Sequence, residues 1–519
     1  MSVKKEKDAK IIGTKKDFLS TVLGIYVFLI MVALPLVIRN KYFDILVTKY
    51  YFYCICTISM LILVLVFVFI DRVRVFSLFK SSQSDKLLKG SDYAALAFLL
   101  ISIISTVNSD YVYESFWGNE GRLTGLFLIS LYVISYFCVS RLWRFKSWYF
   151  NWFLVAGILV CIFGITDYFQ MDILHFKVLM LESQRSIFTS TLGNINTYTA
   201  YVGIIMAVSM VLFTTSKKTI QIIWYYISMV ISFFAIIMGV SDNAYLSLAA
   251  LFGLLPLYLF KYKSGIKRYL VVLATFFTVI QCIDWINIYW KDMVLGIDST
   301  FNMLVAFRGL HYLVIGLWII TAFWYYIDIK YKTVEIDYGN VFRYVWLGVI
   351  AFIVLVFLYM LYDSNIAENY ERYGKLSSYL LFNDEWGTHR GYIWRNAMEC
   401  FSKFSLWKKL IGYGPETFGI LLLRKTANNQ YLEIFDNAHN EYLHCLITVG
   451  IVGLTSYVAL FLACIRNCFR SGKNNPYIIA AAFGIICYST QAFVNLNLPI
   501  TAPIVWLLLG IGSAKSIEE

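Results

Sequence analysis

The chain has 519 residues, of which 60% are hydrophobic and only 15% are charged. A soluble domain carries roughly a quarter charged residues, so this composition excludes a soluble enzyme, a disordered chain, a collagen and a secreted disulfide scaffold. One bilayer span takes about 20 apolar residues, so about fourteen spans would use roughly 280 residues, a little over half of the chain. The composition therefore predicts an all-α polytopic integral membrane protein.

The net charge of +12 does not indicate a nucleic-acid partner. Lys and Arg collect in short cytoplasmic loops of membrane proteins, and a protein with many such loops becomes basic as a consequence. The ten cysteines form no CxxC pair and lie mostly within apolar runs, which is typical of small core-filling residues. We expect neither a zinc site nor a disulfide framework.

Fourteen apolar runs follow one another along the chain. They are 18–38, 51–70, 92–107, 123–140, 148–166, 199–214, 220–240, 245–260, 269–286, 304–328, 342–362, 441–464, 477–493 and 500–513. Lysines precede the first run, which is too long for a signal peptide, so we expect a retained helix and a cytoplasmic N-terminus. Basic segments then alternate with polar outer ones, and the inner segments are 71–90, 141–146, 217–218, 261–268, 330–332 and 466–473.

The predicted organisation has five parts. They are a cytoplasmic tail (1–17), eleven membrane helices (18–362), a long outer loop (363–440), three membrane helices (441–513) and a cytoplasmic tail (514–519). A loop of this length is usually functional. Within it, Trp394, Ala397, Met398 and Phe401 recur at helical spacing, which predicts an amphipathic helix over 388–404, ended by the Gly-Tyr-Gly-Pro of 412–415.

The first candidate site is the sequence Asp-Asn-Ala-His-Asn-Glu-Tyr-Leu at 436–443, directly before a membrane helix. We expect Asp436 or Asn437 to be the N-cap, with His439 in the first helical turn on the outer face. The positive helix end disfavours imidazolium, and a neutral imidazole can accept a proton as a general base. The alternative is a capping cluster beside a histidine at the membrane interface.

Arginines of the outer segments are the second candidate set. Arg122, Arg390 and Arg395 are the strongest, because a guanidinium fork matches phosphate oxygens and stays charged. Arg390 and Arg395 are five positions apart, about 140° around a helix, and need not face one ligand. Taken alone, each arginine is more typical of a solvated or snorkelling position, and Glu399 stands one turn from Arg395 as a salt-bridge partner.

Polar residues at two other outer helix ends form the third set. Asn194 lies in Gly-Asn-Ile-Asn-Thr at 193–197, and Ser241 begins Ser-Asp-Asn-Ala-Tyr at 241–245. They fit either helix capping or hydrogen bonding to a sugar or phosphate. The chain has no P-loop, dinucleotide fingerprint or HExxH motif, so energy must come from the substrate or an ion gradient. Arginines with a neutral histidine fit a lipid-linked sugar pyrophosphate.

These motifs occur in a recognisable order between about residues 110 and 460. The order is Gly121-Arg122, Gly193-Asn194, Ser241, Arg390, Trp394, Gly412-x-Gly414-x-x-x-Phe418, His439-Asn440-x-x-Leu443 and Gly450-x-x-Gly453. It resembles the O-antigen ligase and O-antigen polymerase superfamily. Members of that family are metal-independent, inverting membrane glycosyltransferases of the GT-C type, so the resemblance implies no metal and no cofactor. About fourteen spans exceed the dozen usual in the ligases.

The resemblance implies a glycan transfer on the outer face of the plasma membrane. The donor is undecaprenyl-pyrophosphate-linked and the acceptor is a hydroxyl of a glycan, lipid or protein. By position, His439, Arg390 and Arg122 would be catalytic, with the arginines holding the pyrophosphate and His439 activating the acceptor. The substrate-binding residues would be Arg395, Asn440, Tyr442, Asn194 and Ser241.

Three other functions stay open at this point. One is a flippase for lipid-linked oligosaccharides, which would need charged residues at mid-membrane depth. The second is a protein O-oligosaccharyltransferase, and the third an assembly subunit that binds the same lipid without catalysis. Charge is sparse inside the apolar runs and concentrated in the outer segments, which favours an enzyme.

Overall fold

The computed structural model describes residues 17–70, 88–119, 121–297, 300–305, 307–331, 334–472 and 475–514. It is mostly helical, at 75%. The predicted tails (1–17 and 514–519) and the inner segment 71–90 lie almost entirely outside these residues.

Within the described part of the chain, ten helices are long and apolar enough to cross a membrane. They are α2 (Ile45–Ile70), α4 (Gly90–Val107), α7 (Trp148–Tyr168), α9 (Ile195–Thr215), α10 (Thr219–Met238), α12 (Lys263–Tyr289), α14 (Leu310–Tyr331), α15 (Val341–Asn365), α20 (Glu441–Ser471) and α21 (Pro476–Gln491). The shorter apolar helices are the first helix (Asp17–Ala33), α6 (Leu126–Leu142), α11 (Ala244–Leu259) and α22 (Ala502–Gly512).

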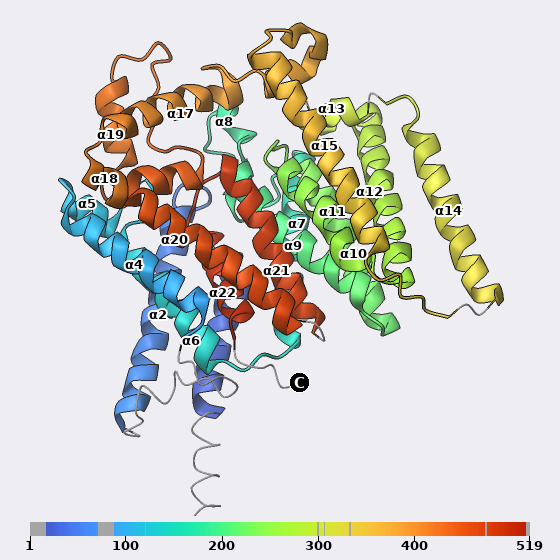
Figure 1. Cartoon of the computed structure of the whole chain (residues 1–519), viewed down its shortest axis with the longest axis horizontal. Helices are drawn as coiled ribbons and strands as arrows, with labels where there is room; N and C mark the ends of the chain where they lie inside the picture. The colour runs from blue at the N-terminus through green and yellow to red at the C-terminus, as the bar shows by residue number, and fades with distance from the viewer. Residues whose placement is uncertain are drawn as a thin grey trace, which may run out of the picture.

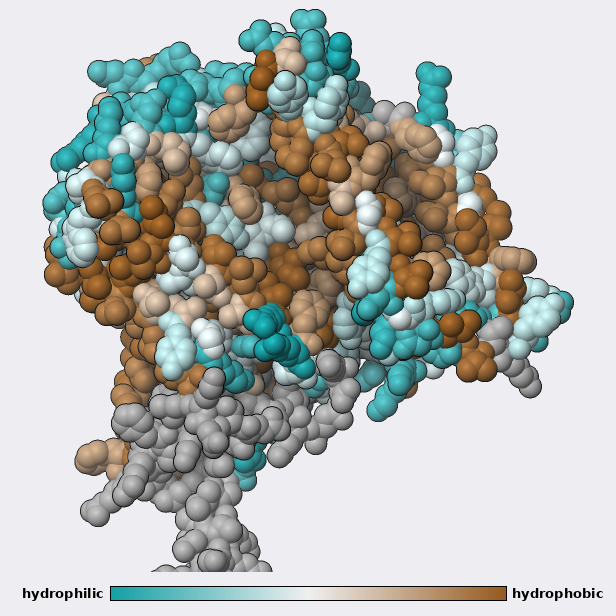
Figure 2. All heavy atoms as spheres, in the orientation of Figure 1, coloured by the Kyte–Doolittle hydropathy of each residue, from teal (hydrophilic) through white to brown (hydrophobic). Residues whose placement is uncertain are grey.

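Every predicted apolar run coincides with one of these helices, so the all-helical, multi-pass membrane architecture is confirmed. Figure 2 shows the corresponding surface, a hydrophobic belt between hydrophilic margins. The number of spans stays a prediction, because four of the fourteen helices are short.

Helix α9 is the centre of the bundle. It is buried along its whole length and packs against α21, α10, α11 and α7. It contains no charged residue, and Gly203 lies directly against Ser247 of α11 and Gln491 of α21. Small residues let helix backbones approach closely in a membrane, where packing rather than water exclusion drives association. The bundle therefore closes around a helix without charged residues.

The loop between α15 and α20 carries short helices at one end of the bundle, and α22 ends at the other end (Figure 1). They are η3 (Tyr370–Leu376), α16 (Ser377–Leu380), α17 (Trp386–Lys403), α18 (Leu406–Ile411) and α19 (Phe418–Thr426). The remaining short elements are η1 (Leu29–Ala33), α5 (Val112–Trp117), α8 (Glu182–Arg185), η2 (Lys291–Met293), α13 (Thr300–Val305), η5 (Ala492–Val494) and the antiparallel pair β1 (Phe188–Thr189) and β2 (Gly193–Asn194).

The predicted amphipathic helix is α17. Its Ile393 and Ala397 are buried in a small apolar cluster, against which Trp394 and Phe401 also pack. Met398, predicted to share this face, is instead 46% exposed. The cluster joins α17 to α19 and to the start of α20, so the loop has a core of its own.

The loop is held against α20 at two glycine motifs, Gly412-x-Gly414 in the loop and Gly450-x-x-Gly453 in the helix. The helix breaks at Gly450, where φ is 73°, and the carbonyls of Ile447 and Thr448 accept hydrogen bonds from the loop amides of Tyr413 (3.1 Å) and Gly414 (2.9 Å). A Cβ at Gly412 would collide with the Thr448 backbone. The break therefore frees carbonyls that the loop then satisfies, which fixes the loop relative to the first turns of α20.

Candidate active site

His439 lies in a tight turn immediately before α20. The N-cap of α20 is Asn440, whose Oδ1 accepts from the Leu443 amide at 3.0 Å. The predicted N-cap, Asp436 or Asn437, and the predicted place of His439 in the first turn are both wrong. Asn437 instead accepts from the His439 amide at 3.0 Å, and His439 takes a left-handed backbone conformation with φ 47°. This local bond competes with capping and turns the imidazole out of the helix.

The imidazole of His439 is held neutral by its surroundings. Burial, together with the positive charges of Arg390 and Arg122, lowers its pKa to about 4, while Asp436 acts in the opposite direction. The imidazole of His439 is thus neutral as predicted, but burial and the two arginines are stronger causes than the positive helix end. It also shows that the structure brings His439, Arg390 and Arg122 within electrostatic range of one another.

Arg122 reaches this turn from the segment that precedes α6. Its Nη2 lies 3.1 Å from both carboxylate oxygens of Asp436, and its side chain is 19% exposed. The buried Nε of Arg122 has no hydrogen-bond acceptor within the described residues. Asp436 therefore orients the guanidinium without using all of its donors.

Arg390 reaches the turn from α17. Its Nη1 donates to Asn243 Oδ1 at 3.4 Å, and Asn243 in turn donates to the carbonyl of Val494 at 3.0 Å. Burial lowers the pKa of Arg390, which the charge of Asp242 partly opposes. A half-buried guanidinium with one long hydrogen bond has donors left for an anion.

Asn194 and Ser241 belong to one hydrogen-bond network next to Asn243. Asn194 is the N-cap of α9 and accepts from the Asn196 amide at 2.8 Å. Ser241 donates to Asn196 Oδ1 at 2.7 Å. Both residues therefore have structural roles at helix ends, and the network places them beside the segment that contacts Arg390.

Three further candidates are engaged with the protein itself. Asn440 caps α20, and the Tyr442 hydroxyl donates to the Ser489 carbonyl at 2.7 Å, which ties α20 to α21. Arg395 is bonded through Nε and Nη2 to the two oxygens of Asp384, at 2.9 and 2.6 Å. The predicted partner of Arg395, Glu399, lies at 3.5 Å. None of the hydrogen bonds of Arg395 reaches the other candidates.

Glu416 and His444 are site residues that the sequence analysis missed. The Glu416 side chain is 1% exposed and accepts hydrogen bonds from Asn119 (3.2 Å) and from the Thr124 hydroxyl. His444 Nε2 lies 3.8 Å from Glu416 Oε2, and His444 Nδ1 lies 3.3 Å from the Asn437 amide. A chain of contacts thus runs from Glu416 to the residue that holds the His439 turn. The one signal in the sequence for His444 is that a histidine stands at the start of an apolar run.

One family model matches part of the chain. Residues 293–458 match a model described as O-antigen ligase. The predicted resemblance to the O-antigen ligase superfamily is confirmed. No curated protein matches the sequence. The O-antigen ligase match supports a glycosyl-transferring membrane enzyme that uses a lipid-linked glycan donor and a glycan acceptor.

The O-antigen ligase segment supplies only part of the candidate site. It contains α14, α15, the loop and the first half of α20, and therefore Arg390 and His439. Arg122, Asn194 and Ser241 come from segments next to helices that precede the match. The site is thus assembled across the boundary of the matched segment, through Asp436 for Arg122 and through Asn243 for Arg390.

Proposed function

We propose that the chain is a GT-C-type glycosyltransferase that moves a glycan from an undecaprenyl-pyrophosphate-linked donor to an acceptor hydroxyl, in the manner of O-antigen ligases or polymerases. The observation that carries the proposal is a half-buried, neutral His439 within electrostatic range of two arginines. A neutral base and two cations suit an acceptor that must lose a proton and a donor that leaves as a pyrophosphate.

Arg390 and Arg122 are assigned to the donor pyrophosphate. Guanidinium forks bind phosphate oxygens in pairs, and they stabilise the charge that builds on the leaving group as its bond to the sugar breaks. Asp436 holds Arg122 in place with two 3.1 Å contacts, and Asn243 does so for Arg390. Fixed cations cost little reorganisation in the transition state.

His439 is assigned as the general base. The acceptor oxygen attacks the anomeric carbon from the side opposite the pyrophosphate, so the new C–O bond forms as the old one breaks and the configuration inverts. The hydroxyl proton moves to the His439 imidazole, and the electron pair of the broken bond leaves with the lipid pyrophosphate. No metal ion takes part in the proposed reaction.

The other predicted substrate-binding residues are assigned roles according to their surroundings. Asn194 and Ser241 are assigned to the sugar side, since their network adjoins the Arg390 partner. Asn440 and Tyr442 shape the site by fixing the start of α20. Arg395 would meet substrate only at the exposed rim. The proposal includes fourteen spans, an outer loop at 363–440 and cytoplasmic termini.

The test is a transfer assay with purified protein in vesicles, a synthetic prenyl-pyrophosphate glycan, and glycan, lipid and peptide acceptors. His439→Ala is compared with His175→Ala, which removes an exposed histidine of another loop. We expect product from the wild type and from His175→Ala and none from His439→Ala. Full activity in His439→Ala would remove the base assignment.

The same assay separates the remaining functions. Movement of the donor across the bilayer without product would indicate a flippase, and binding without either would indicate an assembly subunit. Product on the peptide alone would indicate protein glycosylation. Each of these outcomes would replace the proposed reaction.

A further inference from the structure

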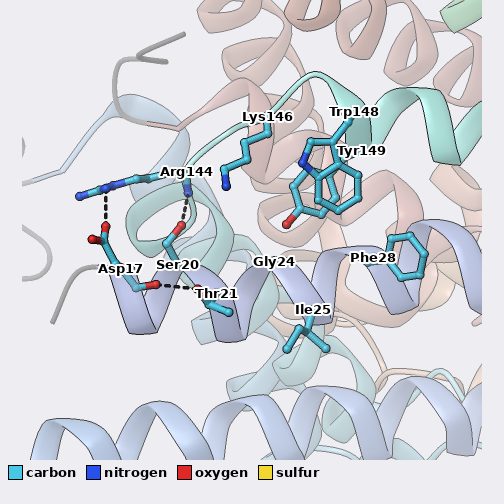
Figure 3. Close-up of a pocket in the computed structure, with 10 residues that line it drawn as sticks. All are labelled: Asp17, Ser20, Thr21, Gly24, Ile25, Phe28, Arg144, Lys146, Trp148 and Tyr149. Carbon is cyan, nitrogen blue, oxygen red and sulfur yellow. Dashed lines mark hydrogen bonds and ion pairs between the residues drawn. The ribbon is translucent and has the colours of Figure 1, made fainter. Parts of the chain in front are cut away.

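A second pocket lies away from the candidate active site. It is formed by the first helix (Asp17–Ala33) and by the segment from Arg144 to Tyr149 that leads into α7, and its volume is about 570 Å³ (Figure 3). Cavities of about 300–1,000 Å³ are typical of ligand sites. The pocket is therefore large enough for the polar part of a lipid.

The pocket is at the opposite end of the helix bundle from His439. Arg122 lies just before α6 and Arg144 just after it, and the 17 residues of that helix span about 25 Å. A donor pyrophosphate bound by Arg122 cannot reach this pocket. A ligand of this pocket therefore binds separately from a donor held by Arg122, and the inference does not depend on the proposed function.

One wall of the pocket carries excess positive charge. Arg144 forms an ion pair with Asp17, with Nη1 and Oδ1 2.6 Å apart, and both side chains are more than half exposed. Within the described residues, the amino group of Lys146 has no hydrogen-bond or ion-pair partner, and Figure 3 shows it directed toward the pocket. Two cations therefore face one carboxylate, which favours an anionic ligand.

The other wall is apolar and open to the surroundings of the bundle. Ile25 is 58% exposed and Trp148 is 41% exposed, and Phe28 packs against Trp148 with ring centroids 6.1 Å apart. Ile25 and Phe28 belong to an apolar helix, and tryptophan is enriched where membranes meet water. Acyl chains can lie along this wall while a headgroup occupies the basic part.

We propose that this pocket binds one anionic phospholipid, with its phosphate against Lys146 and Arg144 and its acyl chains against Ile25, Phe28 and Trp148. Basic pockets between membrane helices bind phosphate-bearing headgroups, and each Lys or Arg near an anionic membrane surface contributes about 1 kcal/mol. A zwitterionic lipid gains less from the same cations.

The test uses the full chain in nonionic detergent, with bound lipid counted by native mass spectrometry and thermal unfolding followed in parallel. The added probes are phosphatidylglycerol, phosphatidylcholine and inorganic phosphate. Arg144→Gln/Lys146→Gln is compared with Lys217→Gln/Lys218→Gln, which removes the same charge at two exposed positions between α9 and α10. Lys146→Gln alone serves as a variant that breaks no ion pair.

We expect the wild type and the Lys217/Lys218 control to retain one phosphatidylglycerol and to unfold at a higher temperature in its presence. The Arg144/Lys146 variant should bind it roughly tenfold to thirtyfold more weakly, and Lys146→Gln about fivefold more weakly. Equal retention of phosphatidylcholine, equal binding by both double variants, or the same stabilisation by inorganic phosphate would overturn the proposal.

Discussion

The two faces of α17 each carry an arginine, and the two arginines have opposite surroundings. Arg390 is half-buried, makes one long hydrogen bond to Asn243, and acts electrostatically on His439. Arg395, five positions later, is 49% exposed and already bonded at both ends of its fork to Asp384. Burial lowers the pKa of Arg390, whereas the carboxylate of Asp384 raises the pKa of Arg395. One guanidinium is available to a ligand, and the other is neutralised by the protein.

The largest expected effect follows from changing the available guanidinium. Arg390→Lys keeps the charge but loses the planar fork, so it binds phosphate oxygens as a single point. We expect the transfer rate kcat to fall about 10²- to 10³-fold, the range for loss of one donor to a developing anion. The check is the transfer assay on the variant, with its folding confirmed by an unchanged elution profile. A rate within about threefold of the wild type would remove Arg390 from the site.

The second prediction concerns the pH dependence that the arginines impose. With the pKa of His439 at about 4, kcat/KM should stay level above that pH and fall only as the pH approaches it. Arg122 disfavours the imidazolium, so Arg122→Gln should raise the pKa toward its ordinary value of about 6.5. The carboxylate of Asp436, which the substitution leaves without its arginine, acts in the same direction. The activity of Arg122→Gln should be about a hundredfold lower than that of the wild type. The acid limb of its kcat/KM profile should lie at higher pH.

The control for that shift is Arg185→Gln, which removes an exposed arginine of α8. Its acid limb should coincide with that of the wild type. An unmoved limb in Arg122→Gln would contradict the electrostatic link between Arg122 and His439, whatever the rate.

A smaller effect is expected from Glu416, which acts through His444 and Asn437 on the turn of His439. Glu416→Gln keeps the shape but removes the charge that faces His444. We expect kcat to fall about tenfold, less than the hundredfold that a misplacement of about 1 Å can cause, with KM for the donor unchanged. An increase in KM with unchanged kcat would instead assign Glu416 to donor binding.

The sequence predicts where the membrane helices lie but not which of them face lipid. Every apolar run became a helix, yet α9 is wholly buried while none of the apolar window of α15 is buried. Of the two, the exposed α15 is the more apolar in sequence. Lipid tails and a protein interior are alike as solvents for an apolar side chain, so hydropathy cannot separate them.

The sequence indicated single residues of the candidate site, including the distant Arg122 and Arg390, but not the contacts that link them. His439 and Asn440 were found, but the capping assignment failed because three possible caps stand within five positions and the Asx bond of Asn437 decided between them. Glu416 escaped notice because its partners Asn119 and Thr124 lie about 300 positions away, beyond any local pattern.

The smallest expected effect completes the contrast between the two faces of α17. Arg395→Gln removes a guanidinium that Asp384 already engages at an exposed position, and exposed ion pairs contribute little to stability. The transfer rate should change by no more than about threefold and the unfolding temperature by little. Asp384→Asn should behave in the same way, since it breaks the same pair from the other side. A large loss of activity in Arg395→Gln, with normal activity in Asp384→Asn, would mean that the guanidinium leaves its carboxylate to bind substrate. Both arginines of α17 would then bind substrate.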